Sequence, residues 1–304
     1  MFKLLEPIAE KSRPILAIGN FDGVHLGHQK LLHTTVKIAK QYKQPAVALI
    51  FYPHPKATLL NIKNELYINN IRIRIKKIIN IGIKSIYIIR PNHKILSTTP
   101  ISFINKVLIN QIKTLQIVVG ENFYFGHNRT GNTKLLSKEL HKYNVRVNIV
   151  PLYQVNNKTC SSTIIKQMIK KGCIKIAEKM LGDSYTIGGR IIKGAQKART
   201  IGFPTANINI ENIVHPPFGV YAAEISINNA IYLPAVVNIG IRPTMCNNKN
   251  PLLEAHILDF NQNIYGAFCI VKIKNFIRAE QKFQSLYQLT QQIKLDVEKI
   301  RQQS

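Results

Sequence analysis

Residues 19–28 read Gly-Asn-Phe-Asp-Gly-Val-His-Leu-Gly-His and connect two segments of different pattern. Before them, residues 15–18 form a short apolar run of the kind that a buried strand shows. After them, apolar residues such as Leu31, Leu32 and Val36 recur near a period of 3.6 residues. The pattern therefore predicts a strand that feeds a helix through a glycine-rich turn.

A turn of this kind suits a nucleotide phosphate. The first backbone N–H groups of a helix are unpaired, the helix dipole is positive there, and glycines let a phosphate approach the backbone closely. His25 and His28 would lie at that helix start, where imidazole donors can meet charge that develops on a phosphate. Either histidine alone could be an ordinary surface residue. A zinc pair is disfavoured, because no third cluster of ligands with matching spacing follows in the sequence.

The first half of the chain alternates short apolar runs with helical patterns. Such alternation is typical of βαβ units and predicts a mostly parallel sheet. Ligands of such sheets bind beyond the carboxyl ends of the strands, where the turns 52–55 and 120–126 are expected beside the glycine-rich turn. The predicted strands are 15–18, 46–51, 85–89, 115–119 and 145–150, and the predicted helices are 29–40, 71–81, 101–110 and 134–143.

The pattern changes beyond Asp183. Short strand candidates separated by turns suggest an antiparallel barrel, and residues 283–300 carry apolar side chains at helical spacing. We place a boundary there, which gives domains 1–183 and 184–304. The strand candidates of the second domain are 188–194, 219–225, 235–240, 253–260 and 268–273.

The composition is that of a globular protein with an unusual charge. The 45% hydrophobic content includes no run of the roughly 18 apolar residues that a membrane helix needs, and residues 1–7 lack the apolar core of a signal peptide. The four cysteines form no Cys-x-x-Cys pair, so we expect reduced thiols and a cytoplasmic protein. The net charge of +27 is spread along the chain, so we expect neither a dedicated nucleic-acid partner nor a membrane.

The motifs of both halves together resemble those of the bacterial bifunctional riboflavin kinases and FAD synthetases, over nearly the whole chain. The glycine-rich turn alone indicates only the nucleotidylyltransferase superfamily, whereas Gly202-Phe203-Pro204-Thr205-Ala206-Asn207 followed by Glu254 narrows the resemblance to flavin kinases. No Gly-x-x-x-x-Gly-Lys-Ser/Thr loop occurs, so a kinase here is not a P-loop enzyme. The other motifs are Phe51-Tyr52-Pro53-His54-Pro55, Gly120-Glu121-Asn122-Phe123-Tyr124-Phe125-Gly126, Ser161-Ser162-Thr163, Gly219-Val220-Tyr221, Asn238-Ile239-Gly240-Ile241-Arg242-Pro243-Thr244, Leu253-Glu254-Ala255-His256-Ile257-Leu258-Asp259-Phe260 and Ile277-Arg278-Ala279-Glu280.

The resemblance implies a fold and two ATP-dependent reactions. The fold is a Rossmann-like α/β nucleotidylyltransferase domain with a parallel sheet, followed by an antiparallel β-barrel of the flavin-kinase type with a terminal helix. The barrel would phosphorylate riboflavin to FMN, and the first domain would adenylylate FMN to FAD with release of pyrophosphate. The implied ligands are riboflavin, FMN, FAD and ATP, with Mg²⁺ as the metal, and no oligomeric state is implied.

The resemblance also implies roles for individual residues. His25 and His28 would be catalytic in adenylyl transfer, and Glu254 would be the general base of the kinase. The ATP and phosphate residues of the first domain would be Gly19, Asn20, Phe21, Asp22, Gly23, Ser161, Ser162, Thr163 and Lys166, and its flavin residues Pro53, His54, Asn122 and Phe123. The ATP and flavin residues of the kinase would be Gly194, Arg199, Gly202, Pro204 and Arg278, with Thr205 and Asn207 at the metal.

The sequence also allows purely structural roles for some of these residues. It allows other functions for the chain as well. Residues 161–163 could simply cap a helix, Thr205 and Asn207 could shape a turn, and Glu254 could face water. The family usually has Arg where this chain has Lys166, which keeps the charge but lacks the bidentate fork. One alternative is an adenylyltransferase whose second domain only binds flavin. Another is a basic RNA- or DNA-binding protein, which predicts clustered Lys and Arg with interleaved aromatic residues.

Overall fold

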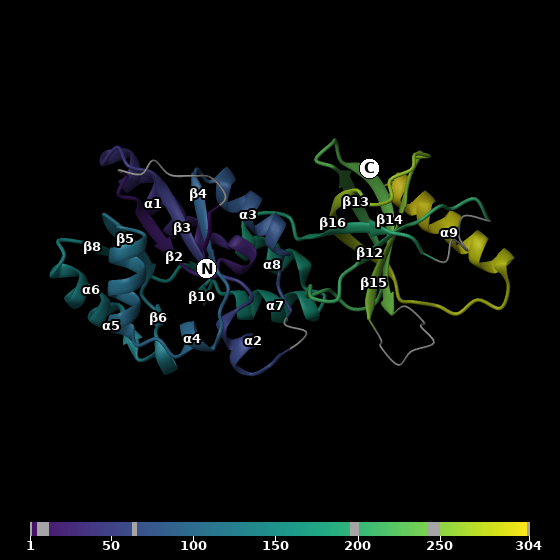
Figure 1. The fold of residues 1–304 in the computed structure, drawn as a ribbon. Coiled ribbons are helices and arrows are strands. Elements are labelled where there is room, and N and C mark those ends of the chain that lie inside the picture. Colours follow the sequence, from purple (N-terminus) through teal and green to yellow (C-terminus); the bar gives the residue numbers. More distant parts are fainter. Residues whose placement is uncertain (1, 5–11, 63–65, 195–200, 242–249, 303–304) are drawn as a thin grey trace. The chain divides into compact units, whose positions relative to one another are not determined.

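The protein is described from a computed structural model that covers residues 2–4, 12–62, 66–194, 201–241 and 250–302 (Figure 1). The chain divides into two compact units. One unit comprises Met1–Glu65 and Ile71–Ser162, and the other comprises Leu66–Asn70 and Thr163–Ser304. A short segment from the first half of the sequence thus belongs to the second unit.

The first unit is built on a six-stranded sheet with the order β1-β4-β3-β2-β5-β8. The predicted parallel strands are confirmed, and they are β2 (Ile15–Ile18), β3 (Ala46–Phe51), β4 (Ser85–Ile89), β5 (Gln116–Gly120) and β8 (Arg146–Val150). The edge strand β1 (Phe2–Leu4), which the sequence did not indicate, pairs antiparallel with β4. The sheet is therefore mostly parallel, as expected.

Both faces of the central strands β2, β3 and β5 are buried, which explains why these strands read as continuous apolar runs. Along β2, Ile15 and Ala17 belong to one hydrophobic core, and Leu16 and Ile18 belong to the other. The first core includes residues of α1 (Leu26–Gln41) and α3 (Ile71–Asn80). The second core includes residues of α6 (Thr133–His141) and of a helix made of α5 (Pro100–Phe103) and the π-helical η2 (Ile104–Gln111). The four helices predicted for this half are confirmed.

The carboxyl ends of β2, β3 and β5 meet at one edge of the sheet, because these strands are parallel neighbours. The three turns singled out from the sequence follow these strands, so they lie along the same edge. The short elements of the first unit are η1 (Asp22–Val24), α2 (Pro55–Leu59), α4 (His93–Leu96), β6 (Tyr124–Phe125), η3 (His127–Arg129), β7 (Gly131–Asn132), β9 (Gln154–Val155) and β10 (Lys158–Thr159).

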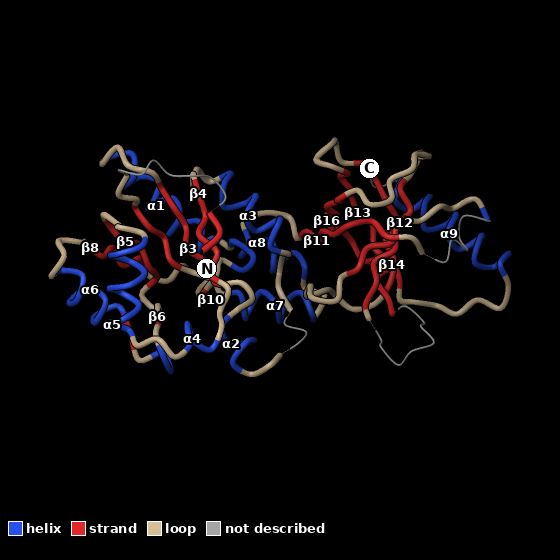
Figure 2. Tube along the Cα trace, in the orientation of Figure 1, coloured by secondary structure: helices blue, strands red, loops and turns tan. Residues whose placement is uncertain are grey.

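The second unit contains a closed antiparallel barrel with the order β11-β12-β15-β14-β13-β16, whose strands are red in Figure 2. Its strands are β11 (Thr186–Ile192), β12 (Ala206–Asn209), β13 (Gly219–Ile227), β14 (Leu233–Ile241), β15 (Pro251–Ile257) and β16 (Phe268–Arg278). Fully buried residues such as Ile208, Val237 and Leu253 fill it. The predicted barrel is confirmed, but β12 was missed, because four residues with two asparagines give a weak strand pattern.

Three helices lie in the described residues of the second half of the chain, besides the barrel strands. They are α7 (Ser162–Lys170), α8 (Ile174–Leu181) and α9 (Leu286–Arg301). Ile300 and Val297 of α9 pack against Val220 and Val236 on the barrel, so the predicted terminal helix is present and covers part of the barrel. None of the helices within the described ranges is long and apolar enough to cross a membrane.

The segment Leu66–Asn70 is joined to the barrel unit by hydrogen bonds. Tyr67 forms a parallel bridge with Ile213, and the Asn69 side-chain amide donates to the Thr186 carbonyl at 2.9 Å. The Asn70 amide donates to the Gly188 carbonyl at 2.7 Å. Packing thus groups this segment, α7 and α8 with the barrel, whereas the functional boundary at Asp183 stays a prediction.

Candidate functional site

The glycine-rich turn that follows β2 is shaped by its aromatic residue. Phe21 is fully buried and has the left-handed φ of 50°. A Cβ atom at Gly19 would lie only 3.0 Å from the Phe21 ring, and Gly23 has a φ of 82°, which side chains rarely adopt. Both glycines are therefore required by the turn itself, and they leave its backbone free of side-chain bulk.

His25 and His28 lie together at the start of α1, where the sequence placed them. His25 is the N-cap residue, and its Nδ1 accepts a hydrogen bond from the His28 main-chain N–H at 3.3 Å. The two imidazole rings are stacked with their centroids 3.6 Å apart, and the Phe21 ring meets His28 edge-on. A Cβ atom at Gly27 would lie 3.2 Å from the His25 ring, so the glycine leaves room for this ring.

Both histidines are uncharged at neutral pH. Burial lowers the pKa of His25 to about 4, against a smaller opposing effect of the Asp22 carboxylate. Burial also holds the pKa of His28 well below its usual value, and the neighbouring His25 and Arg74 act in the same direction. Because Nδ1 of His25 is an acceptor, its single proton is on Nε2. The pair can thus donate hydrogen bonds without carrying a charge.

The structure adds Arg74, which the sequence analysis did not single out. This side chain of α3 is 1% exposed, and it donates from Nη1 to the Asn20 carbonyl at 3.1 Å and from Nη2 to Asp22 Oδ1 at 3.2 Å. Its guanidinium also lies 5.9 Å from the centre of the Tyr52 ring. The sequence contained an indication that Arg74 is buried. Arg74 shares a helix face with Ile71 and Ile78, where an apolar residue is expected.

The proposed flavin residues of the first domain lie in the turns after β3 and β5. His54 is the N-cap residue of α2, where its Nδ1 accepts from the Lys56 N–H at 3.1 Å, and Pro53 is exposed. Asn122 is exposed, whereas Phe123 is half-buried and stacks on Phe125. These residues share one sheet edge with the histidine pair, and Asn122 and Pro53 present the most accessible surface.

The hydroxyl-rich segment 161–163 approaches the glycine-rich turn. Ser162 is the first residue of α7, and its Oγ donates to the Asp22 carbonyl at 2.9 Å. Ser161 precedes it and is partly exposed. Thr163 and Lys166 belong to the second unit, where the Lys166 ammonium lies 5.6 Å from the centre of the Tyr67 ring. The structure thus brings Ser162 to Asp22.

Two of the proposed kinase residues, Glu254 and Asn207, lie on neighbouring barrel strands. In the strand register, Glu254 of β15 is opposite both Asn207 of β12 and Asn238 of β14, so the three side chains are on one face. A Cβ atom at Gly194 would overlap the Asn207 side-chain amide. Glycine at position 194 is therefore needed for the chain to pass beside Asn207.

The turn before β12 is supported by a residue outside the proposed set. His256 Nδ1 lies 3.0 Å from the Pro204 carbonyl oxygen, and the His256 ring meets the Phe203 ring edge-on. Gly202 has a left-handed φ of 87° with open space where a Cβ atom would be. Arg199, another proposed kinase residue, lies outside the described residues.

The residues proposed at the metal offer only neutral oxygen donors. The Thr205 hydroxyl and the Asn207 amide oxygen are hard ligands, which suit Mg²⁺. Across the described ranges, no three His, Cys, Asp or Glu side chains come together as a possible metal site. The donor set therefore fits an ion that is bound largely through the phosphates of ATP, which is how Mg²⁺ commonly binds.

Arg278 has a different neighbourhood from the other proposed kinase residues. Its guanidinium forms a bidentate ion pair with Asp296 of α9, with Nη2 at 2.8 Å from Oδ2 and Nε at 3.1 Å from Oδ1. Asp296 is 1% exposed and also accepts from Gln292 Nε2 at 3.0 Å. The guanidinium lies 5.8 Å from the centre of the Phe283 ring. Arg278 thus fastens α9 to the end of β16.

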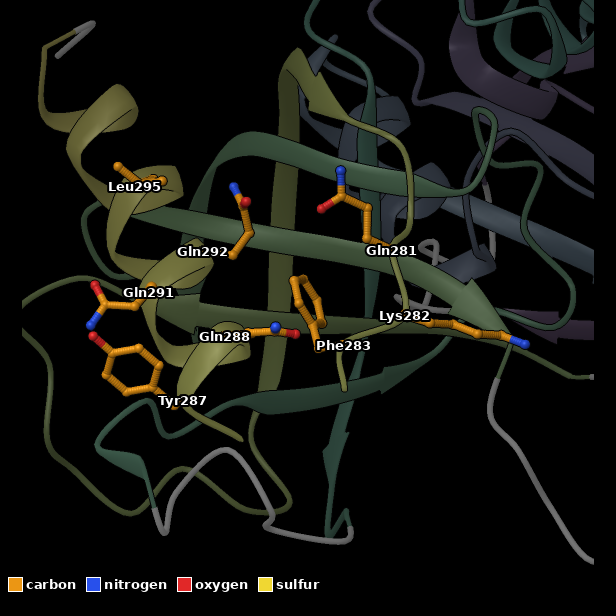
Figure 3. Close-up of a pocket in the computed structure, with 8 residues that line it drawn as sticks. All are labelled: Gln281, Lys282, Phe283, Tyr287, Gln288, Gln291, Gln292 and Leu295. Atoms are coloured by element: carbon orange, nitrogen blue, oxygen red, sulfur yellow. The ribbon is translucent and has the colours of Figure 1, made fainter. Parts of the chain in front are cut away.

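A pocket of about 530 Å³ is shown in Figure 3. Two of its lining residues, Gln292 and Phe283, contact Asp296 and Arg278. Figure 3 shows that its walls come from the segment after β16 and from one side of α9. The sequence analysis placed Phe283 and Tyr287 only in a helical pattern, and it did not note that Gln288, Gln291 and Gln292 recur at the three- and four-residue spacing of one helix face. The lining residues are Gln281, Lys282, Phe283, Tyr287, Gln288, Gln291, Gln292 and Leu295.

Two family models match successive parts of the chain. Residues 8–164 match the family model for FAD synthetase, and residues 181–304 match the model for riboflavin kinase. The bifunctional riboflavin kinase/FMN adenylyltransferase of Buchnera aphidicola from Acyrthosiphon pisum is 37% identical, over 94% of this chain and 92% of the relative. The Bacillus subtilis protein of the same description is 33% identical, over 94% of this chain and 91% of the relative.

One solved structure is similar over almost the whole chain. It is a crystal structure described as a macrolide-efflux protein from Streptococcus pneumoniae, with 31% sequence identity and a TM-score of 0.83. The match covers 97% of this chain and 95% of that chain. The arrangement of an α/β unit followed by a barrel unit is therefore shared with a protein of known structure.

The first unit is a parallel α/β unit whose glycine-rich turn suits a nucleotide phosphate, and the second unit contains a closed barrel. Together they indicate a nucleotide-dependent transferase with two domains. Both family models match, and the relatives match along more than nine-tenths of this chain. The chain belongs to the family of bifunctional riboflavin kinase/FMN adenylyltransferases.

Proposed function

We propose that the two halves of the chain catalyse consecutive steps of flavin cofactor synthesis at separate sites. Riboflavin and ATP give FMN and ADP at the barrel, and FMN and ATP give FAD and pyrophosphate at the glycine-rich turn. The observation that carries the proposal is the stacked pair of uncharged histidines at the start of α1, behind a turn whose glycines leave the backbone accessible. Membership of the family supports both activities.

For adenylyl transfer, a phosphate oxygen of FMN attacks the α-phosphorus of ATP. The new P–O bond forms while the bond from the α-phosphorus to the bridging oxygen breaks, and pyrophosphate leaves with the bonding electrons. Such a reaction depends on alignment and on stabilisation of the developing charge. His25 Nε2–H, His28 and the N–H groups of the first turn of α1 are the donors suited to this task.

The ATP phosphates would be held by the segments around these histidines. We assign this role to Gly19, Asn20, Phe21, Asp22 and Gly23, together with Ser161, Ser162, Thr163 and Lys166. The hydrogen bond from Ser162 to the Asp22 carbonyl supports the grouping of the two segments. FMN would bind along the same sheet edge, against Pro53, His54, Asn122 and Phe123.

For the kinase step, Glu254 would accept the proton of the terminal ribityl hydroxyl. The freed oxygen attacks the γ-phosphorus of ATP, the bond to the β–γ bridging oxygen breaks, and ADP leaves with the bonding electrons. Thr205 and Asn207 would hold Mg²⁺ together with the phosphates, and the ion supplies charge neutralisation when bound. Gly194, Gly202 and Pro204 would shape the ATP site, and Arg199 is assigned to it from its motif.

The pocket beside α9 suits the flavin ring system of riboflavin. Phe283 and Tyr287 offer aromatic surface, and the glutamine amides offer donors and acceptors for the polar edge of a flat heterocycle. Arg278 would act here by holding α9 through Asp296. This assignment adds Phe283, Tyr287 and Gln288 to the residues taken from the sequence.

A cytoplasmic location is part of the proposal. Cys160, Cys173 and Cys269 are free thiols in the structure, which suits a reducing compartment. Detection of the protein in the cytoplasmic fraction of lysed cells, with an enzyme of that compartment as marker, tests the location.

The activity test is a time course with the purified chain, riboflavin, ATP and Mg²⁺, in which flavins are separated by chromatography. We expect FMN to appear first and FAD to follow. Reactions with FMN in place of riboflavin, and with the metal removed by a chelator, are the controls. FAD from FMN but no product from riboflavin would favour the alternative in which the barrel only binds flavin. No turnover of either flavin would contradict the proposal.

A further inference from the structure

We propose that Arg74 is a positioning residue for adenylyl transfer, which fixes the glycine-rich turn in the shape that receives the phosphate chain of ATP. The inference rests on the function proposed for that turn. Arg74 itself would not touch a reacting atom. It would act through Asn20 and Asp22, whose carbonyl and carboxylate it binds.

The backbone that Arg74 holds is strained. Phe21 and Val24 have φ values of 50° and 47°, a region that is costly for aromatic and β-branched residues. Such conformations persist only where the surrounding structure fixes them. Arg74 binds Asn20 immediately before Phe21 and Asp22 immediately after it, so one side chain holds both flanks of the strained residue.

The same contacts join α3, the glycine-rich turn and Ser162, all within the first unit. The Arg74 guanidinium reaches from α3 to the Asp22 carboxylate, and the Asp22 carbonyl accepts from Ser162 at the start of α7. On its other side the guanidinium faces the ring of Tyr52, in the turn after β3. Arg74 and Ser162 thus both bind the turn that would hold ATP. Arg74 also faces Tyr52 in the turn proposed to hold FMN.

Arg74 also contributes to the charge state of His28. The groups that face His28 are the rings of His25 and Phe21 and the charge of Arg74, and Asp22 acts on His25. The positive charge of Arg74 disfavours protonation of His28. Without that charge His28 would take up a proton at a higher pH, so the acid limb of the pH profile should move upward.

The test compares Arg74→Lys and Arg74→Met with Arg72→Met as the control in the full chain, since Arg72 is exposed on the same helix. The rates of FMN adenylylation and of riboflavin phosphorylation are both measured, with thermal unfolding as a check of the fold. We expect Arg74→Met to lower kcat for adenylylation about 100-fold, as misplaced reacting groups do. Arg74→Lys should restore only part of the rate, because Lys lacks the planar guanidinium that binds two acceptors at once. It should keep the acid limb of the pH profile at the wild-type pH, because Lys keeps the positive charge.

Three outcomes separate the possibilities. A wild-type kcat and acid limb in a folded Arg74→Met protein, with only a lower melting temperature, would overturn the proposal and leave Arg74 a structural residue. If Arg74→Met does not fold, Arg74→Lys decides: a kcat about 10-fold lower at unchanged KM supports positioning, and an unchanged kcat contradicts it. If the wild-type chain makes no FAD from FMN, the proposed function itself has failed, whatever the variants do.

Discussion

Glu254 of β15 is the direct cross-strand neighbour of Asn207 of β12 in the barrel. Cβ atoms of such neighbours are about 5 Å apart, so the carboxylate and the amide can act on one ligand. Gly194 lies against Asn207, because a Cβ atom at Gly194 would overlap Asn207 Nδ2. The chain is closely packed at this point. The pairing of β12 with β15 therefore brings the proposed base beside a proposed metal residue, although the two residues are far apart in the sequence.

Replacement of this base should separate the two activities. We expect Glu254→Gln to lower the rate of FMN formation by about 100-fold or more, the usual contribution of a general base, and to leave the conversion of FMN to FAD unchanged. Glu224→Gln is the matched control, because Glu224 is a barrel carboxylate that pairs with Lys274 at 3.2 Å on β16. Equal loss of both activities in a folded Glu254→Gln protein would contradict two separate sites.

The reciprocal experiment uses the histidine pair. We expect His28→Ala to lower FAD formation about 100-fold, because a donor to the developing charge is lost, while riboflavin phosphorylation continues. His33→Ala on the exposed side of the same helix should change neither reaction. Chromatography of both reactions gives the answer, and loss of FMN formation in His28→Ala would show that the sites are not independent.

The lowered pKa values of the histidines predict a pH-dependent stability of the first unit. Below pH 6.5 the unfolded chain binds more protons than the folded one, so stability is complete above that pH and is lost as the pH falls toward 4. The shift of His25 alone should cost about 2 kcal/mol between pH 6.5 and 5. Urea denaturation at both values measures it. In His25→Asn, which keeps an N-cap acceptor, the loss should shrink; an unchanged loss would contradict the assignment.

The ion pair between Arg278 and Asp296 predicts a coupling of stability to flavin binding. Asp296→Asn leaves the guanidinium without its charge partner, and breaking a buried pair costs about 3 to 5 kcal/mol. Because α9 lines the pocket, the KM for riboflavin should rise as well. The double variant Arg278→Met/Asp296→Leu should recover stability, since no charge is left buried. Thermal unfolding and riboflavin titration measure the two effects, and an unchanged KM would exclude a role of this helix in flavin binding.

The hydrogen bonds of the segment Leu66–Asn70 predict that the stability of the barrel depends on residues far from it in the sequence. Asn69→Ala removes two hydrogen bonds to Thr186 and should lower the unfolding free energy of the barrel unit by about 1 to 3 kcal/mol. Asn80→Ala, an exposed change at the end of α3, should have little effect. A melting curve of each variant, followed by kinase activity, measures this. Equal melting temperatures would mean that the segment contributes nothing to the barrel.

The sequence predicted the parts of the fold that follow from simple periodicity. The bounds of β2, β3 and β4 were predicted to the residue, because strands buried on both faces are short apolar runs. The barrel and α9 followed in the same way. β12 was missed, because Asn207 and Asn209 interrupt its pattern, and β1 was missed at the edge of the sheet.

The parts of the site that were missed depend on tertiary packing. Arg74 was not distinguished from Arg72, because only the packing of α3 makes one buried and the other exposed. The link between Leu66–Asn70 and β11 joins residues more than 100 positions apart, which no local pattern records. The histidine pair was found because both residues and their glycines lie in one local motif. Its uncharged state could not be predicted, since burial decides it.

Labelled ATP shows which phosphorus atom each half of the chain transfers. The chain is incubated with riboflavin, Mg²⁺ and ATP labelled either at the α- or at the γ-phosphorus, and the flavins are separated. Two attacks at different phosphorus atoms predict γ-label in both FMN and FAD, and α-label in FAD alone. Absence of α-label from every flavin, or of γ-label from FMN, would contradict the account of two sites with two chemistries in one chain.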